Sequence, residues 1–216
     1  MGKIKNIVFD LGGVILDLDR DRAVRRFEQI GLSDAEELID PYHQKGIFLD
    51  LEEGRIDRNE FYRLLREHMG KDVSEKDIDY AWMGFIVALP EYKLDYILKL
   101  RESYKVYLLS NTNPIIMGWA RTGEFTPTGN PITYYFDKIY TSYEMGVCKP
   151  AARIFNFMMK DADMNPEETL FVDDGKSNTD MAAGMGFVTY TPANGEDWRE
   201  ALNEILNIYI KNLMKI

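Results

Sequence analysis

The chain has 216 residues, of which 45% are hydrophobic and 29% charged, a composition typical of a globular protein with one large domain or a core and a small companion. Its 26 basic and 36 acidic residues leave a net charge of −10, which argues against a nucleic-acid partner because phosphate contacts need clustered Lys and Arg. A single cysteine, Cys148, excludes an internal disulfide framework, and without an apolar run of about 20 residues we expect a cytoplasmic protein with no membrane contact.

Short apolar runs alternate with helical patterns along most of the chain. Strands are expected at residues 4–10, 105–110, 138–141, 169–173 and 187–190. Helices are expected at residues 91–102, 151–162, 179–185 and 198–214. Continuous apolar strands, without polar alternation, are typical of a parallel sheet covered on both faces. The pattern therefore predicts an α/β fold with a doubly wound, Rossmann-like parallel sheet.

The stretch from residue 20 to residue 89 breaks this alternation, because it has helix signals and no convincing strand. Ser33, Asp57 and Ser74 are suited to begin helices, and Gly70 to end one. We therefore predict an α-helical bundle cap over residues 17–90, inserted into an α/β core formed by residues 1–16 and 91–216. Within that core, residues 118–135 are rich in Gly and Pro. We expect them to form a long connection between core elements, and the sequence does not indicate its role.

Polar residues follow three of the expected strands, at the edge where open α/β sheets bind ligands. Asp10 precedes a glycine pair, Ser110 ends the second strand, and Asp173 and Asp174 follow the fourth. Taken singly, Asp10 fits a capped turn, and Ser110 a polar turn or a phosphate contact. Two adjacent carboxylates are costly unless a cation or solvent relieves them, and Mg²⁺ prefers such oxygen ligands. Lys149, ahead of Pro150, offers a cation near this edge.

Together and in this order, these segments resemble the haloacid dehalogenase superfamily over essentially the whole chain. The segments 9–12 (Phe-Asp-Leu-Gly), 110–113 (Ser-Asn-Thr-Asn) and 173–174 (Asp-Asp) are most similar to its α-D-glucose-1-phosphate phosphatase-like branch. The resemblance implies a Mg²⁺-dependent phosphatase of a small phosphorylated metabolite, a sugar phosphate such as a sugar 1-phosphate, that works through an aspartyl-phosphate.

The resemblance also implies a role for each matching residue. Asp10 is the nucleophile, and Lys149 balances its charge. The remaining roles are metal binding by Asp10, Asp174, Asp173 and the carbonyl of Gly12, phosphate binding by Ser110, Asn111 and Lys149, and support by Asn178.

Gly12 departs from the family pattern, in which an aspartate two residues after the nucleophile protonates the leaving alcohol. Losing such a group typically costs about 10²–10⁴ in rate. The chain could be a phosphatase selective for acidic leaving groups such as a sugar 1-phosphate, or Asp17 could replace the missing acid/base. It could also be a non-catalytic phosphometabolite-binding protein, or a haloacid dehalogenase, which needs no Mg²⁺.

The cap is the part that can distinguish substrates, because the core contacts mainly the phosphate. Glu53 and Arg55, on either side of Gly54, are the best candidates for substrate contact, with Lys45, Tyr80 and Trp82 as weaker ones. A small cap over a pocket implies a small metabolite rather than a phosphoprotein. The sequence leaves open whether the protein is a monomer or a homodimer.

Overall fold

A computed structural model describes residues 3–40 and 44–213 of the chain. Its centre is a five-stranded sheet in the order β5(Lys138–Thr141), β4(Lys105–Ser110), β1(Asn6–Phe9), β6(Thr169–Val172) and β7(Val188–Tyr190). Every neighbouring pair is parallel, with Asn6 of β1 opposite Lys105 on one side and Thr169 on the other. The predicted doubly wound parallel sheet is confirmed, with all five strands at the expected places.

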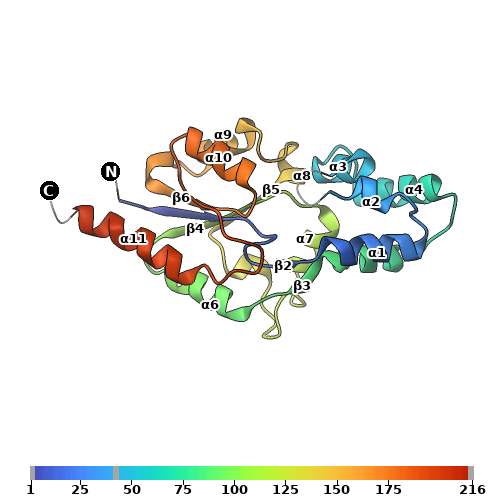
Figure 1. The fold of residues 1–216 in the computed structure, drawn as a ribbon, viewed down its shortest axis with the longest axis horizontal. Coiled ribbons are helices and arrows are strands. Elements are labelled where there is room, and N and C mark those ends of the chain that lie inside the picture. The colour runs from blue at the N-terminus through green and yellow to red at the C-terminus, as the bar shows by residue number, and fades with distance from the viewer. Residues whose placement is uncertain (1–2, 41–43, 214–216) are drawn as a thin grey trace.

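Helices cover both faces of this sheet, because successive side chains of a strand point to opposite faces. On one face, Ile7 and Phe9 pack with α6(Glu91–Leu100) and α11(Arg199–Leu213), where Phe9 and Trp198 place their ring centroids 5.0 Å apart. On the other face, Val8 packs with α9(Ala152–Asp161) and α10(Lys176–Gly184). Figure 1 shows these two pairs of helices on opposite sides of the sheet.

The predicted helix bounds agree closely with the structure except at one start. Helix α10 begins at Lys176, three residues before the expected start, because its first turn is polar and adds nothing to the apolar periodicity. The end predicted for α11 at residue 214 lies outside the described residues. The shorter elements are α7(Pro114–Ala120), α8(Ser142–Met145) and the 3₁₀ turns η1(Met83–Phe85), η2(Ile132–Tyr134) and η3(Pro166–Glu168).

The inserted stretch is helical as predicted and lies at one end of the sheet (Figure 1). Its centre is a cluster of four buried aromatic side chains, Phe27, Phe48, Phe61 and Trp82, with ring centroids of contacting pairs 5.2 to 5.9 Å apart. Its helices are α1(Arg20–Ile30), α2(Ala35–Leu38), α3(Gly46–Glu52), α4(Arg58–Met69) and α5(Glu75–Trp82). We call these helices the cap.

Two of the three predicted helix starts in the cap are confirmed. Asp57 accepts a hydrogen bond from the Glu60 amide at 2.8 Å, and Ser74 accepts one from the Asp77 amide at 3.2 Å. The prediction for Ser33 was wrong: α2 is preceded by Asp34, whose carboxylate contacts His68 instead of capping the helix.

Two short strands at the ends of the insert are absent from the sequence-based prediction. β2(Asp17–Leu18) and β3(Ile86–Ala88) form an antiparallel pair where the chain leaves the core and returns to it. Elements of two and three residues are too short to show a period, so the expectation of no strand between residues 20 and 89 was wrong. The domain boundaries at residues 17 and 90, which stay a prediction, fall beside this pair. Over the described ranges, no helix is long and apolar enough to span a membrane.

Candidate active site

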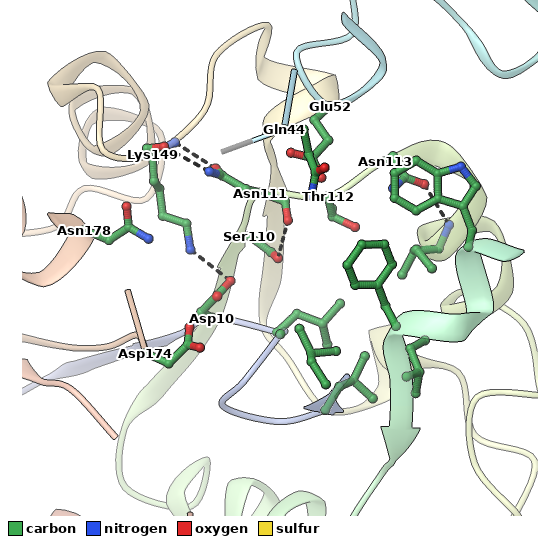
Figure 2. Close-up of a pocket in the computed structure, with 18 residues that line it drawn as sticks. Asp10, Gln44, Glu52, Ser110, Asn111, Thr112, Asn113, Lys149, Asp174 and Asn178 are labelled. Atoms are coloured by element: carbon green, nitrogen blue, oxygen red, sulfur yellow. Dashed lines mark hydrogen bonds and ion pairs between the residues drawn. The ribbon is translucent and has the colours of Figure 1, made fainter. Parts of the chain in front are cut away.

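Three neighbouring strands bring their polar ends together at one edge of the sheet. β4 ends at Ser110, β1 is followed by Asp10, and β6 is followed by Asp173 and Asp174. Because β4, β1 and β6 are parallel neighbours, their carboxyl ends converge at one pocket. Figure 2 shows that pocket, whose core-side lining includes the predicted residues Asp10, Gly12, Ser110, Asn111, Lys149, Asp174 and Asn178.

Lys149 is the centre of the polar contacts beneath this pocket. Its side chain is 1% exposed, and its Nζ lies 2.9 Å from Oδ1 of Asp10 and 2.6 Å from Oδ2 of Asp173. The Nζ also donates a hydrogen bond to the carbonyl of Leu109 at 2.9 Å. Burial by itself would lower the pKa of Lys149, but the two carboxylates outweigh it and raise that pKa above its usual range. The ammonium is therefore charged and fixed in place.

Asp173 is fully buried, and both of its carboxylate oxygens accept hydrogen bonds. One oxygen binds Lys149, and the other accepts hydrogen bonds from the Gly175 amide at 2.8 Å and from Nδ2 of Asn178 at 2.9 Å. The carboxylate therefore lies behind the pocket lining and positions Lys149 and Asn178. Its further role as a metal ligand stays a prediction.

The acidic cluster has the donor set of a divalent cation site. Single carboxylate oxygens of Asp10, Asp173 and Asp174 all lie within 4.8 Å of one another. Burial raises the pKa of Asp10 to about 6, with Lys149 opposing and Asp173 adding to the shift, and burial and both neighbouring aspartates raise the pKa of Asp174 to about 7. Among the described residues, Oδ1 of Asn178 is buried and has no hydrogen-bond partner. Such oxygens fit Mg²⁺, whose charge would relieve the repulsion between the carboxylates.

Ser110 and Asn111 line the side of the pocket formed by β4. Ser110 is 2% exposed, and its hydroxyl donates to the carbonyl of Asn111 at 3.3 Å. The Asn111 side chain brackets the backbone of Lys149, donating to its carbonyl at 2.9 Å and accepting from its amide at 2.7 Å. Asn111 therefore orients Lys149, and the phosphate contacts expected of Ser110 and Asn111 stay predictions.

Asp17 does not line this pocket. Its carboxylate forms an ion pair with Nζ of Lys93 at 3.1 Å, and the side chain of Lys93 is 0% exposed. A side chain at Gly12 would meet Leu18, since an ideal Cβ there lies 2.7 Å from Cδ1 of Leu18. The region where the family's acid/base aspartate would begin is thus filled by an apolar group, and Asp17 serves instead as the counterion of a buried lysine.

The cap contributes a carboxylate that the sequence analysis did not single out. Glu52, at the end of α3, lines the pocket together with Gln44 and Trp82. Of the predicted cap contacts, Trp82 lies at the pocket, whereas Glu53 and Arg55 do not. Arg55 is paired with Asp50 at 2.6 Å and with Glu53.

The remaining two cap candidates also lie away from the pocket lining. Lys45 precedes α3 as its N-cap residue, and Tyr80 is 58% exposed. A signal for Glu52 was present in the sequence: Phe48, Leu51 and Glu52 have the spacing of one helix face, and all three are buried.

Glu52 is held in an unusual environment for a carboxylate. The residue is 8% exposed, and within residues 3–40 and 44–213 no hydrogen bond or ion pair of its carboxyl group is found. Burial raises its pKa to about 8, with Asp10 adding to the shift and Lys149 opposing it. Its backbone carbonyl accepts a hydrogen bond from Sγ of Cys148 at 3.8 Å, which joins the end of α3 to the loop that bears Lys149.

Comparisons with known proteins agree with this geometry. Residues 4–186 match a family model described as haloacid dehalogenase-like hydrolase. The D-ribitol-5-phosphate phosphatase of Bacteroides thetaiotaomicron is 52% identical over 204 residues, which cover 94% of this chain and 99% of that protein. A haloacid dehalogenase-like hydrolase from Porphyromonas gingivalis has a TM-score of 0.91 at 45% identity, covering 95% of this chain and 98% of its own.

A second similar structure is a complex with magnesium and inorganic phosphate. A wild-type haloacid dehalogenase family enzyme from Bacteroides thetaiotaomicron, in complex with magnesium and inorganic phosphate, has a TM-score of 0.84 at 46% identity. The match covers 92% of this chain and 98% of that one. These likenesses confirm the predicted resemblance to the haloacid dehalogenase superfamily, while the branch within it stays a prediction. The magnesium complex agrees with the donor set of the acidic cluster.

Proposed function

Since this chain belongs to the haloacid dehalogenase-like hydrolase family, we propose that it is a Mg²⁺-dependent phosphomonoester hydrolase of a small phosphorylated metabolite. The observation that supports this most directly is Lys149, whose ammonium lies between Asp10 and Asp173 beside Asp174. The three carboxylates supply three negative charges, which Lys149 and one Mg²⁺ balance. A site neutralised in this way accepts an anionic phosphate that bare carboxylates would repel.

In the proposed reaction, an oxygen of Asp10 attacks phosphorus and forms an aspartyl-phosphate, which water then hydrolyses. Lys149 keeps that carboxylate ionised and oriented, because its own position is set by the second ion pair with Asp173. Ser110 donates its hydroxyl hydrogen to a phosphoryl oxygen. Mg²⁺, held by Asp10, Asp174 and the carbonyl of Gly12, with Asp173 as a further predicted ligand, would supply positive charge to the phosphoryl group.

The substrate class is proposed from a relative whose match covers 94% of this chain and 99% of its own length. That relative is named for D-ribitol 5-phosphate, in which the phosphate is esterified to a primary alcohol of a small polyol. We propose a substrate of this class, a polyol or sugar phosphate. The sugar 1-phosphate suggested by Gly12 stays a prediction, as do the cytoplasmic location and the monomeric or dimeric state.

The experiment is phosphate release from a panel of esters with and without Mg²⁺. The panel contains D-ribitol 5-phosphate, hexose 6-phosphates and sugar 1-phosphates. A halogenated acid is tested separately for halide release. Asp10→Asn is measured in parallel, because it keeps the size of the side chain and removes the nucleophile. Mg²⁺-dependent release by the wild type alone supports the proposal. Binding of esters without release would favour the non-catalytic protein, and halide release without Mg²⁺ would favour the dehalogenase.

A further inference from the structure

We propose that Glu52 of the cap helix α3 is the general acid and base of this enzyme, in place of the carboxylate that is absent at Gly12. The inference rests on the proposed phosphatase function and names a catalytic residue for it. A primary alcohol is a poor leaving group, because its alkoxide is strongly basic. A phosphatase of such esters therefore needs a proton donor beside the leaving oxygen.

The pocket offers few donors. In the part of the chain that the structure describes, its titratable lining residues are Asp10, Glu52, Lys149 and Asp174. Asp10 is the proposed nucleophile, and Lys149 is bound to two carboxylates and a carbonyl. Asp174 belongs to the acidic cluster beside Asp10. Glu52 alone in this set has no other proposed task.

Glu52 also lies on the side where the leaving group departs. In an in-line displacement, the leaving oxygen lies opposite the attacking oxygen. Asp10 comes from the sheet and Glu52 from the cap, and Figure 2 shows Ser110 and Asn111 lying between them along the pocket wall. A phosphoryl group between Ser110 and Asp10 would thus present its ester oxygen towards the cap. Beside Gly12, the nearest side chain is the apolar Leu18, whose Cδ1 lies 2.7 Å from an ideal Cβ at that position.

The environment of Glu52 suits an acid that is protonated before reaction. The residue is buried and forms no ion pair among the described residues, and the raised pKa of about 8 keeps the carboxyl protonated at neutral pH. The charged or titratable groups that act on it are Asp10, Lys149 and the thiol of Cys148, whose own pKa burial raises to about 12. Once ionised, the carboxylate is stabilised by the positive charge of Lys149.

The two steps balance with Glu52 restored at the end. In the first, Asp10 forms a bond to phosphorus, the bond from phosphorus to the ester oxygen breaks, and the alkoxide takes the proton of Glu52. In the second, water gives a proton to the Glu52 carboxylate as its oxygen attacks phosphorus, and the bond from phosphorus to Asp10 breaks. The products are the alcohol and phosphate, and both carboxyl groups return to their starting states.

The test compares good and poor leaving groups in Glu52→Gln, with saturating Mg²⁺. D-Ribitol 5-phosphate requires protonation of its leaving group, whereas p-nitrophenyl phosphate and acetyl phosphate release stable anions. For Glu52→Gln we expect kcat/KM on the ribitol ester to fall by about 10²–10⁴-fold, and kcat/KM on the other two to change far less. Because the second step also loses its base, p-nitrophenyl phosphate should give a burst of one nitrophenolate per active site.

Two further variants keep the test decisive. Asp50→Asn makes the same change from carboxylate to amide on the same helix, at a side chain that pairs with Arg55 away from the pocket lining. It should leave turnover of both classes of substrate unaffected. Glu52→Asp keeps an acid and should recover part of the ribitol activity if Glu52→Gln is poorly folded. Equal losses on all three substrates, or no loss on the ribitol ester, would overturn the assignment of Glu52. Failure of the wild type to release phosphate from any ester would instead overturn the proposed function.

Discussion

The ion pair between Asp17 and Lys93 is expected to be a structural requirement of the link between core and cap. The ammonium of Lys93 is 0% exposed and lies 3.1 Å from the Asp17 carboxylate, which is 27% exposed. Asp17→Asn leaves that ammonium buried without its counterion. Breaking a buried pair costs about 3–5 kcal/mol, and partial access of water to Asp17 places the cost in free energy of unfolding nearer 2–3 kcal/mol.

This cost can be measured by thermal denaturation. In a protein of this size, 1 kcal/mol corresponds to about 2–4 °C in melting temperature, so Asp17→Asn should melt about 4–12 °C lower. The double variant Asp17→Asn/Lys93→Met removes the stranded charge and should recover most of the loss. The control is Asp180→Asn, which breaks the exposed pair with Lys176 and should cost no more than about 1 kcal/mol.

Two results would refute this reasoning. One is an Asp17→Asn variant as stable as Asp180→Asn, and the other is a double variant as unstable as the single one. The single variant Asp17→Asn also tests whether Asp17 is the missing acid/base. Since its carboxylate is bound to Lys93 outside the pocket lining, the pH profile of phosphate release should keep its shape in Asp17→Asn, and loss of one limb of that profile would contradict the structure.

Three further predictions concern the metal site. Burial raises the pKa of Asp10 to about 6 and of Asp174 to about 7, so their contribution to the stability of the metal-free protein is present below pH 3.8 and is lost as pH rises through 6 and 7. Mg²⁺ should therefore raise the melting temperature more above pH 7 than below pH 6. Equal shifts in melting temperature at the two pH values would contradict this. Gly13→Ala should abolish this effect of Mg²⁺ on the melting temperature, since φ at Gly13 is +71° and an ideal Cβ there lies 2.1 Å from Oδ2 of Asp174. The control is Gly70→Ala, where φ is +60° and an ideal Cβ has no atom within 4 Å. This variant should keep the effect of Mg²⁺ and lose about 1–2 kcal/mol of stability. Lys149→Met should lower kcat/KM by about 10²–10³-fold and raise the pKa of Asp10, measured as a shift of the pH dependence of Mg²⁺ binding to higher pH; an unchanged pH dependence would show that Lys149 does not set the charge of Asp10.

The core-side residues of the site could be identified from the sequence because they follow buried strands directly. A continuous apolar run predicts a strand of a parallel sheet, and the carboxyl ends of such strands meet at one edge. Asp10, Ser110 and Asp174 were therefore placed together without knowledge of their distances, and the structure has all three at one pocket. Their side chains are adjacent because β4, β1 and β6 are neighbours in the sheet. That strand order follows from the fold class.

The pocket residues of the cap could not be identified from strand ends, because their position depends on how the cap packs against the α/β core. Glu53 and Arg55 were favoured since they flank Gly54 in a loop-like stretch, yet their charges pair with each other at the surface. Glu52, one residue earlier, faces the pocket. A step of one residue on a helix turns the side chain by about 100°, so the choice between Glu52 and Glu53 depended on the packing of Phe48 and Leu51 into the aromatic centre of the cap.

Apolar periodicity and strand ends are local properties of the chain, so the parallel sheet, the helical insert and the chemical types of the core-side residues can be predicted from the order of the amino acids. Which carboxylates are buried, and what each one contacts, depends on how distant segments of the chain pack together. Asp173 is held by Lys149 and Asn178, Asp17 by Lys93, while Glu52 has no such partner among the described residues. The charge state and function of a carboxylate follow from desolvation and neighbouring charges, and both are fixed by contacts between residues far apart in the chain.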